Sequence, residues 1–248
     1  MGGDGRGRRA TPRTAWATVP GRELHTGARV DRFYAHGPGA RAGALRVGVH
    51  EARIRAGVSP VAGMGARPRP GLPSPRIMFT GRFSPDKAPD VLVEAVARMA
   101  APPPVLMLGA GVLEDDLHER VARLRLERVV RFSGWVDEPG AWVAGAAVQA
   151  CPSRDEAFSQ TAVLAMGLGV PVIGTDVDSF PDTLADRRGI VVASEDPEAL
   201  ARALEDVLTG RRRPDTAAAR TWARQFDADR VAAIYEHGYD ELSRAVAS

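Results

Sequence analysis

The chain has 248 residues, a hydrophobic content of 44% and a formal net charge of +2, which suits a globular protein of one large or two small domains. It contains no apolar run of the roughly 20 residues that span a bilayer and no signal-peptide core, so we expect a cytoplasmic protein, with peripheral contact to a membrane left open. Its one cysteine, Cys151, excludes an internal disulfide framework and is expected to be a buried structural thiol rather than a nucleophile.

The charge is divided unevenly along the chain. Residues 1–76 carry 14 arginines and 4 acidic residues, a net charge of +10, whereas the remaining residues carry 19 cationic and 27 acidic residues, a net charge of −8. In the first part the arginines are scattered among glycine and proline, without an amphipathic helix, so residues 1–75 are predicted to be a poorly ordered leader. The alternative, a nucleic-acid-binding segment, requires binding that weakens with salt and disappears when residues 1–70 are removed.

From residue 76 onward, segments of strand character alternate with segments of helical apolar spacing. The predicted strands are residues 77–81, 104–108, 129–133, 148–151, 170–174 and 189–193. The predicted helices are residues 89–99, 114–125, 137–144, 157–168, 197–208 and 229–245. Such alternation implies a parallel sheet covered by helices on both faces. The sequence therefore predicts an α/β fold, with a Rossmann-like domain over residues 76–227 and an amphipathic C-terminal helix within residues 228–248.

Lys87 is the only lysine in the chain, and it follows the first predicted strand in Gly81-Arg82-Phe83-Ser84-Pro85-Asp86-Lys87. A guanidinium fork and an ammonium five residues apart, in a turn that follows a buried strand, are suited to binding a diphosphate. The alternative is that Lys87 is a surface lysine left over in an arginine-biased sequence.

The segment around Glu156 is the second candidate, because ligands of open parallel sheets bind beyond the carboxyl ends of the strands. A polar turn over residues 152–156 leads into a predicted helix, so the first-turn amides of residues 157–159 are expected to bind an anion opposite Arg82 and Lys87. Glu156 itself would suit sugar hydroxyls rather than phosphate; its alternative role is that of a helix-capping acid. The sequence has no zinc spacing, P-loop or complete dinucleotide fingerprint, so neither a metal nor a cofactor is predicted.

Taken in order, five motifs resemble those of family 4 (group 1) of the retaining glycosyltransferases, and more narrowly the donor-binding C-terminal domain of their two-domain GT-B fold. The resemblance covers about residues 75–245. The motifs are Gly-Arg-x4-Lys ending at Lys87, Leu-Gly-x-Gly ending at Gly111, Val-x-Phe-x-Gly ending at Gly134, Pro-Ser-x-x-Glu-x-Phe ending at Phe158, and Ala-Met-x-x-Gly-Val-Pro-Val-Ile-Gly-Thr ending at Thr175.

The resemblance implies the transfer of a hexose from a nucleotide-diphosphate sugar to an unknown acceptor. Arg82 and Lys87 would hold the diphosphate and stabilise the leaving group, and Glu156 would contact the transferred sugar. The donor is a substrate, so no cofactor is implied. The positions expected to bind the donor are Gly81, Gly109, Gly111, Gly134, Trp135, Val136, Ala157, Phe158, Ser159 and Gln160.

One departure from the family pattern affects the nucleotide. The family carries a second glutamate, which hydrogen-bonds the ribose, eight residues after the first, and this position is Leu164 here. A charge-assisted hydrogen bond is worth about 1.5–3 kcal/mol, and a leucine cannot make one. We expect Gln160, one helical turn earlier, to take over the ribose contact. The glycines usual beside the lysine and the first glutamate are replaced by Ala88, Ala157 and Ser159.

A second departure is that the family's acceptor-binding N-terminal domain has no counterpart; only residues 25–33 resemble its interdomain strand-and-turn. We therefore expect residues 1–75 to hold a linker remnant. We expect the chain to be an incomplete enzyme, with two alternatives left open: a truncated enzyme, or a split one whose acceptor domain comes from a second chain. We also expect an exposed apolar stripe from Val231 to Leu242. The alternative function is a non-catalytic nucleotide-sugar-binding or partner module. A sugar-nucleotide epimerase on the same fold would need acid and base groups from both domains, and no such set is found.

Overall fold

The computed structural model describes residues 30–35, 38–74 and 76–246, which belong to two compact units that divide between Val58 and Ser59. The arginine-rich leader up to residue 29, including most of the segment that resembles an interdomain strand-and-turn, lies outside the described residues. The division falls earlier than the boundary expected after residue 75.

Unit 1 is a short parallel β-α-β arrangement within the segment expected to be a leader. Strands β1 (Phe33–Ala35) and β2 (Ile54–Ala56) pair in parallel, and α2 (Pro38–Arg46) and the 3-10 helix η1 (Glu51–Arg53) connect them. The backbone ladder continues where Gly57 N donates to Ala35 O at 2.8 Å. Over residues 33–56 the expectation of a poorly ordered leader is therefore wrong. Strands of three residues are too short for sequence periodicity to reveal them.

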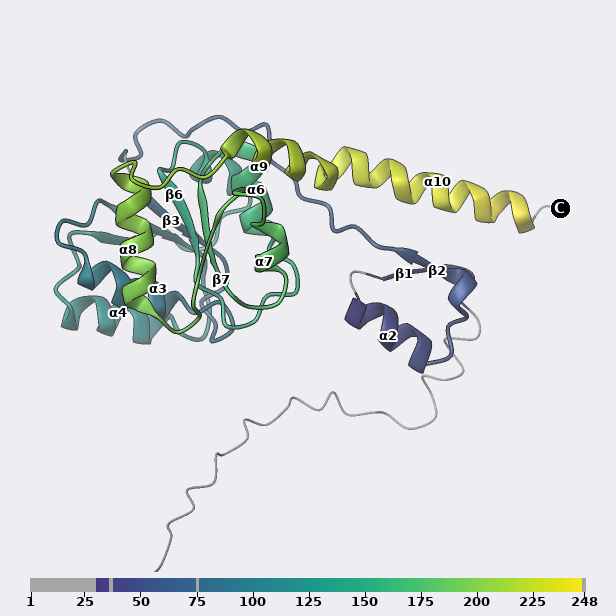
Figure 1. Ribbon diagram of the computed structural model, residues 1–248, viewed down its shortest axis with the longest axis horizontal. Helices are drawn as coiled ribbons and strands as arrows, with labels where there is room; N and C mark the ends of the chain where they lie inside the picture. The colour runs from purple at the N-terminus through teal and green to yellow at the C-terminus, as the bar shows by residue number, and fades with distance from the viewer. Residues whose placement is uncertain (1–29, 36–37, 75, 247–248) are drawn as a thin grey trace, which may run out of the picture. The chain divides into compact units, whose positions relative to one another are not determined.

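Unit 2 is built on a six-stranded, fully parallel sheet of strand order β5-β4-β3-β6-β7-β8 (Figure 1). The strands are β3 (Ile77–Thr80), β4 (Val105–Leu108), β5 (Val130–Phe132), β6 (Val148–Cys151), β7 (Val172–Thr175) and β8 (Ile190–Val192). The helices are α3 (Pro89–Arg98), α4 (Glu114–Arg123), α5 (Gly140–Val143), α6 (Gln160–Leu168), α7 (Phe180–Thr183), α8 (Pro197–Leu208), α9 (Thr216–Ala223) and α10 (Ala228–Val246), with the 3-10 helix η2 (Arg224–Phe226) before α10. The predicted α/β parallel fold is confirmed.

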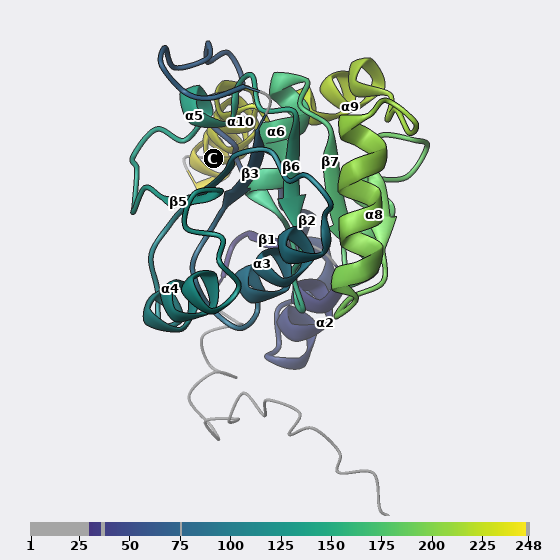
Figure 2. The same ribbon diagram turned by 90° about the vertical axis from the view of Figure 1, so that its left-hand side faces the viewer.

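The helices cover both faces of this sheet (Figure 2). Alternate residues of β3 point to opposite faces, so Ile77 and Phe79 pack in one apolar cluster with α3, α4 and α8, and Met78 packs in another with α5, α6 and α9. All three side chains are at most 2% exposed. Because both faces of the sheet are covered by helices, the strand sequences are almost continuously apolar instead of alternating between apolar and polar residues.

The segment from Ser59 to Ser74 belongs to unit 2 because it packs along the sheet's helices. Val61 N donates to Phe226 O at 2.7 Å, and Arg69 N donates to Ala141 O at 2.8 Å. The guanidinium of Arg69 also lies 4.4 Å from the ring centroid of Trp142, a cation–π distance. These contacts move the division of the chain to Val58.

The predicted elements agree with the structure except at short helices. Helix α8 has the predicted bounds, since Asp196 caps it and Pro197 fills its first position. Helix α6 begins at Gln160, three residues later than predicted, and α5 is confined to four residues. Helices α7 and α9 were not predicted; α7 has only four residues, and α9 is rich in alanine, so neither has a clear apolar period.

Helix α10 follows η2 and has 19 residues. Its first turn is anchored by Val231, which is 1% exposed, whereas Ile234 and Tyr239 further along are 42% and 66% exposed. Val231 and Gly238 are buried, and Tyr235 and Leu242 are half-buried. The expected exposure of the stripe from Val231 to Leu242 is therefore found only at Ile234 and Tyr239.

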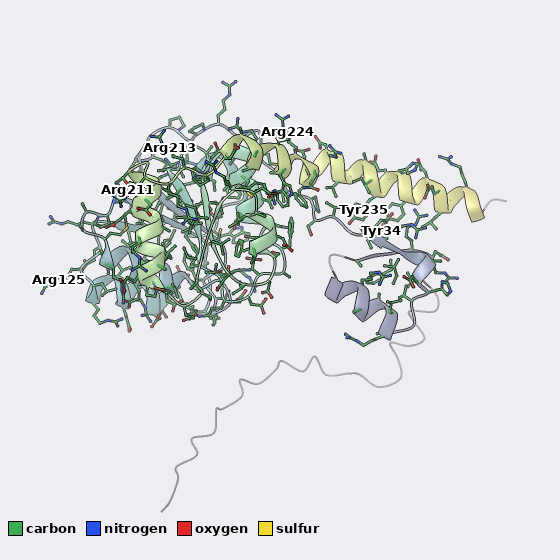
Figure 3. The ribbon with its side chains drawn as sticks, in the orientation of Figure 1. Tyr34, Arg125, Arg211, Arg213, Arg224 and Tyr235 are labelled. Carbon is green, nitrogen blue, oxygen red and sulfur yellow. The ribbon has the colours of Figure 1, made fainter. Side chains whose placement is uncertain are left out.

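Exposed arginines gather at the edge of the sheet where the strands begin. Arg211 and Arg213 follow the end of α8, and Arg224 opens η2 (Figure 3). Because α8 starts after the carboxyl end of β8, its own end lies at the opposite edge of the sheet. These side chains therefore add no charge to the carboxyl edge, where a ligand of a parallel sheet binds.

Arg76 is a buried cation that joins the start of β3 to the α5–β6 connection. It is 2% exposed, and burial lowers its pKa. Its guanidinium donates to the carbonyls of Pro73 at 2.9 Å, Trp142 at 2.7 Å and Ala144 at 2.8 Å. Carbonyl dipoles thus solvate the charge in place of water.

We expect Arg76→Met to lower the free energy of unfolding by about 3 kcal/mol, because three buried or part-buried carbonyl hydrogen bonds lose their donor. The measurement is the urea midpoint. The matched control is Arg202→Met, which removes an exposed arginine 2.5 Å from Glu198 and should change stability by less than about 0.5 kcal/mol. Equal losses for the two variants would contradict the role given to Arg76.

Candidate active site

A cavity of about 210 Å³ opens at the carboxyl ends of β3 and β6. These two strands are neighbours in the sheet although β4 and β5 lie between them in the sequence. The chain therefore leaves β3 in one direction and returns on its other side, which is the topological switch point where open parallel sheets bind ligands. The cavity is lined by Phe79, Thr80, Gly81, Lys87, Ala150, Cys151, Ser153, Glu156, Phe158, Ser159, Gln160 and Thr161.

Lys87 and Glu156 form an ion pair inside this cavity. Lys87 Nζ lies 2.8 Å from Glu156 Oε2, and the two side chains are 23% and 7% exposed. Ser153 Oγ donates to the same carboxylate oxygen at 3.4 Å, and Asp86 Oδ2 lies 3.7 Å from the ammonium. The lone lysine is therefore in the cavity, and the view of it as a leftover surface residue is wrong.

The main chain of Glu156 is held by the loop after β7. Asp178 Oδ2 accepts from Glu156 N at 2.8 Å, and Ser179 Oγ donates to Glu156 O at 2.8 Å. Since the carboxylate bonds Lys87 and Ser153 rather than a helix amide, the alternative role of Glu156 as a capping acid is not what the structure shows.

Helix α6 is capped by Ser159 instead. Ser159 Oγ accepts from Ala162 N at 3.3 Å, and the first backbone bond of the helix runs from Val163 N to Ser159 O at 3.1 Å. Residues 157–159 therefore precede the helix, which corrects the expectation that they form its first turn. The amides left over by the helix are those of Gln160 and Thr161, and both residues line the cavity.

Arg82 does not line the cavity. Its side chain is 66% exposed and its Nη2 lies 3.2 Å from Asp86 Oδ2. The structure thus brings Lys87 and Glu156 together and leaves Arg82 at the outer side of the same loop. A role for Arg82 in binding a diphosphate stays a prediction, and it requires this arginine to leave Asp86.

Gly109 and Gly111 lie directly against the backbone of the loop that carries Arg82. Phe83 N donates to Ala110 O at 2.9 Å, and Leu113 N donates to Phe83 O at 2.9 Å. A Cβ on Gly109 would lie 1.9 Å from Gly81 O, and one on Gly111 would lie 2.4 Å from Phe83 O. Neither glycine lines the cavity; each permits two backbones to approach closely.

Four other expected positions also lie outside the cavity lining. Trp135 is 71% exposed, and Val136 packs against the apolar cluster beneath α6. Gly134 has open space where a Cβ would be, at a φ of +64°. Ala157 is exposed on the loop before α6. Contacts of these residues with a ligand stay predictions.

The cavity also contains polar groups that sequence analysis missed, namely those of Thr80, Ser153 and Thr161. Thr80 Oγ1 is buried and has no hydrogen-bond partner among the described residues. Ser153 is the second residue of the Pro-Ser-x-x-Glu-x-Phe motif and Thr161 follows the motif by three residues, so the polar run from Pro152 could have indicated both. Cys151 is free and buried, as expected; burial, with the charge of Glu156 adding to it, raises the pKa of its thiol to about 12.

Over the described ranges, no cluster of three His, Cys, Asp or Glu side chains could hold a metal ion. Over the same ranges, no helix combines the length and the apolar character that crossing a membrane requires.

Residues 74–210, more than half of the chain, match the family described as "Glycosyl transferases group 1". The chain is 33% identical over 198 residues to a D-inositol 3-phosphate glycosyltransferase of Streptomyces griseus, an alignment that covers 73% of this chain and 40% of the relative. It is 37% identical over 158 residues to the same-named enzyme of Streptomyces avermitilis, covering 57% of this chain and 34% of that enzyme. The chain thus spans about two-fifths or less of these relatives' length.

Solved structures share the fold. The crystal structure of Anabaena HepE in complex with UDP-glucose has a TM-score of 0.73 at 19% identity, covering 89% of this chain and 66% of that one. The sucrose-phosphate synthase of Thermosynechococcus elongatus has a TM-score of 0.69 at 24% identity, covering 90% of this chain and 62% of that one.

Substitutions in the cavity are predicted to change the affinity of the chain for anions. With inorganic pyrophosphate as the probe, we expect Lys87→Met to weaken binding by roughly 10- to 100-fold, because a charged donor is lost. We expect Glu156→Gln to tighten binding by about tenfold, because it frees the Lys87 ammonium from its ion pair and removes a negative charge that repels pyrophosphate. Isothermal titration calorimetry measures both.

The control for this pair is Arg98→Gln, which removes a charge paired with Glu94 on α3, outside the cavity. It should leave pyrophosphate binding unchanged. If Lys87→Met binds as the parent chain does, the cavity is not the anion site.

Proposed function

This chain belongs to the group 1 glycosyl transferases, and from that premise we propose that unit 2 binds a nucleotide-diphosphate sugar and transfers its hexose, with retention of configuration, to an acceptor held elsewhere. The observation that carries the proposal is the meeting of Lys87, Glu156 and the start of α6 in one cavity. The nucleotide sugar is a substrate, and the proposal invokes neither a metal nor a cofactor. A cytoplasmic location belongs to the proposal as well.

The diphosphate has complementary donors in this cavity. Lys87, Gln160 and Thr161 line its wall, and the dipole of α6 adds positive potential at the N-terminus of that helix. When the bond to the sugar breaks, negative charge grows on the leaving phosphate, and donors fixed beforehand stabilise that charge most effectively. Arg82 would join Lys87 once it leaves Asp86.

Glu156 is suited to the sugar rather than to the phosphate. Its carboxylate accepts hydrogen bonds, and sugar hydroxyls are donors, whereas a phosphate oxygen would be repelled. Binding of the diphosphate to Lys87 would release Glu156 from its ion pair at the moment when the sugar arrives. Lys87 would thus exchange its bond with Glu156 for one with the diphosphate, and Glu156 would exchange its bond with Lys87 for one with the sugar.

The volume of the cavity supports placing the nucleotide base outside it. At about 210 Å³ the cavity is smaller than the roughly 300–1,000 Å³ typical of pockets that enclose a whole ligand. We therefore place the base over the segment after β5, where Trp135 is 71% exposed. An exposed indole offers a stacking surface of the kind that bases use.

The ribose contact is the part of the proposal that departs from the family pattern. Leu164 is 4% exposed and packs in the apolar cluster beneath α6, so it offers nothing to a hydroxyl. Gln160, one turn earlier on the same helix, is exposed and lines the cavity. Its amide can both donate to and accept from the ribose.

We expect Gln160→Ala to weaken the binding of UDP by roughly three- to tenfold, the value of one neutral hydrogen bond, and to leave pyrophosphate binding unchanged. Calorimetric titration with each probe separates the two effects. Gln225→Ala is the matched control, since Gln225 donates to Trp222 O at 3.0 Å on the exposed side of η2 and lies outside the cavity lining. Unchanged UDP affinity in Gln160→Ala would remove Gln160 from the ribose site.

The second candidate function is a nucleotide-sugar-binding module without transferase activity. It is favoured by Leu164, a buried apolar residue at the position where the family carries a ribose-binding glutamate. In this alternative a second chain would carry out the transfer. Ile234 and Tyr239 of α10 are exposed apolar side chains that such a chain could cover.

Slow hydrolysis of UDP-glucose by the full chain separates the two functions, because water replaces the missing acceptor. We expect release of UDP above the uncatalysed rate, measured by chromatography, and its loss in Lys87→Met through the missing leaving-group stabilisation. Proton NMR of the first glucose released should show the α-anomer, as retention requires. Binding of UDP-glucose without any release would instead support the binding module.

A further inference from the structure

Arg154 connects three loops at the carboxyl edge of the sheet. Its guanidinium forms a two-pronged contact with Asp90 in the first turn of α3, with Nη1–Oδ1 at 3.0 Å and Nη2–Oδ2 at 2.9 Å. It also bonds Glu195 on the loop after β8, and its Nη1 donates to Pro85 O at 2.9 Å. A planar fork that matches a carboxylate fixes orientation as well as distance.

The backbone of Arg154 makes the same connection. Arg154 N donates to Asp86 O at 2.8 Å, and Asp155 N donates to that oxygen at 3.3 Å. Asp86 precedes Lys87, and Asp155 precedes Glu156. Lys87 and Glu156 therefore each directly follow a residue, Asp86 or Asp155, whose backbone takes part in the hydrogen bond between the two loops.

Backbone strain at this edge agrees with a tightly determined arrangement. Ala88, Asp178 and Glu195 have φ values of +49°, +44° and +59°, in the left-handed region that residues with a Cβ avoid. Each adjoins a contact already described: Ala88 follows Lys87, Asp178 binds Glu156 N, and Glu195 binds Arg154. Such strain persists only where surrounding contacts over-determine the backbone, and it concentrates at functional sites.

We infer that Arg154 is a positioning residue that sets the distance between Lys87 and Glu156, and through it the fit of the cavity to a diphosphate sugar. The inference deepens the proposed function and rests on it for the identity of the ligand. Arg154 lines no part of the cavity, so it acts through the two loops rather than on the ligand. A misplacement of about 1 Å at such a site can cost on the order of 100-fold in rate.

Arg154, Asp90 and Glu195 together form what we call the Arg154 clamp. Its Arg154–Asp90 pair is charged at neutral pH. Burial alone would raise the pKa of Asp90, but the hydrogen bonds and charge of Arg154 outweigh burial and lower it. The pKa of Arg154 is raised, chiefly by its hydrogen bonds to Asp90. Because the folded pKa of Asp90 is depressed, the stabilisation is present above the unfolded value of 3.8 and is lost only as pH falls through the folded value.

The test uses the single lysine of the full chain. Amine-directed reductive methylation modifies only Lys87 and the N-terminal amine, and peptide mass spectrometry distinguishes the two. In the parent chain Glu156 shields the ammonium at 2.8 Å. We expect Arg154→Ala to release the loops, to raise the rate of Lys87 modification several-fold, and to weaken pyrophosphate binding by about tenfold or more.

Arg76→Ala is the matched control. Like Arg154→Ala it removes a guanidinium that makes several hydrogen bonds, but it does so at the opposite edge of the sheet. It should lower the melting temperature and leave Lys87 modification unchanged. An unchanged rate in Arg154→Ala, or the same increase in both variants, would overturn the inference. If Arg154→Ala does not fold, Asp90→Asn replaces it; this variant weakens the clamp and should give a smaller increase, whereas no increase would count against the inference.

The labelling result does not depend on any nucleotide. A parent chain that binds neither UDP nor UDP-glucose would sink the proposed function and leave the comparison of Lys87 reactivity intact. Conversely, nucleotide binding by the parent chain with equal Lys87 reactivity in all variants would retain the function and remove Arg154 from its positioning role.

Discussion

The pairing of β3 with β6 is the constraint on which the site depends. It places the ends of two strands side by side although 69 residues separate Lys87 from Glu156. The loop after each strand then contributes one member of the ion pair and one wall of the cavity. Everything else at this edge, from the glycines behind the Arg82 loop to the Arg154 clamp, fixes these two loops against each other.

The electrostatics of the site are a balance rather than an excess of positive charge. Arg82, Lys87 and Arg154 face four carboxylates, those of Asp86, Asp90, Glu156 and Glu195. An anion is therefore not attracted by net charge; it has to replace existing partners of the cations and to meet donors already aligned at the start of α6. This makes binding depend on geometry, since preorganised donors stabilise a charge without a cost of rearrangement. The exposed arginines at the other edge of the sheet take no part in this balance.

Membership of the group 1 glycosyl transferases and the spatial arrangement bear on different questions. The family match covers the sheet and its loops from residue 74 to residue 210, and it gives the chemistry that the cavity is proposed to perform. The replacement by Leu164 concerns the ribose, for which Gln160 at the cavity wall is the proposed partner. The proposed donor binding uses residues of unit 2, whereas the proposed transfer also needs an acceptor site.

Several features were determined by the sequence alone. Short and mostly apolar runs next to a glycine or proline marked β3, β4 and β6, and helical spacing with a capping Asp196 and Pro197 marked α8, because these signals are local. The lone lysine and the motif around Glu156 were visible for the same reason. Sequence could not show that α6 begins at Gln160, since Ser159 competes with earlier residues as a cap and Asp178, on the loop after β7, accepts from Glu156 N. It also missed the β-α-β arrangement of residues 33–56, whose strands are only three residues long. The contacts of Lys87 with Glu156 and of Arg154 with Asp90 were decided by the tertiary structure alone, because they join residues that only strand order brings within hydrogen-bonding distance.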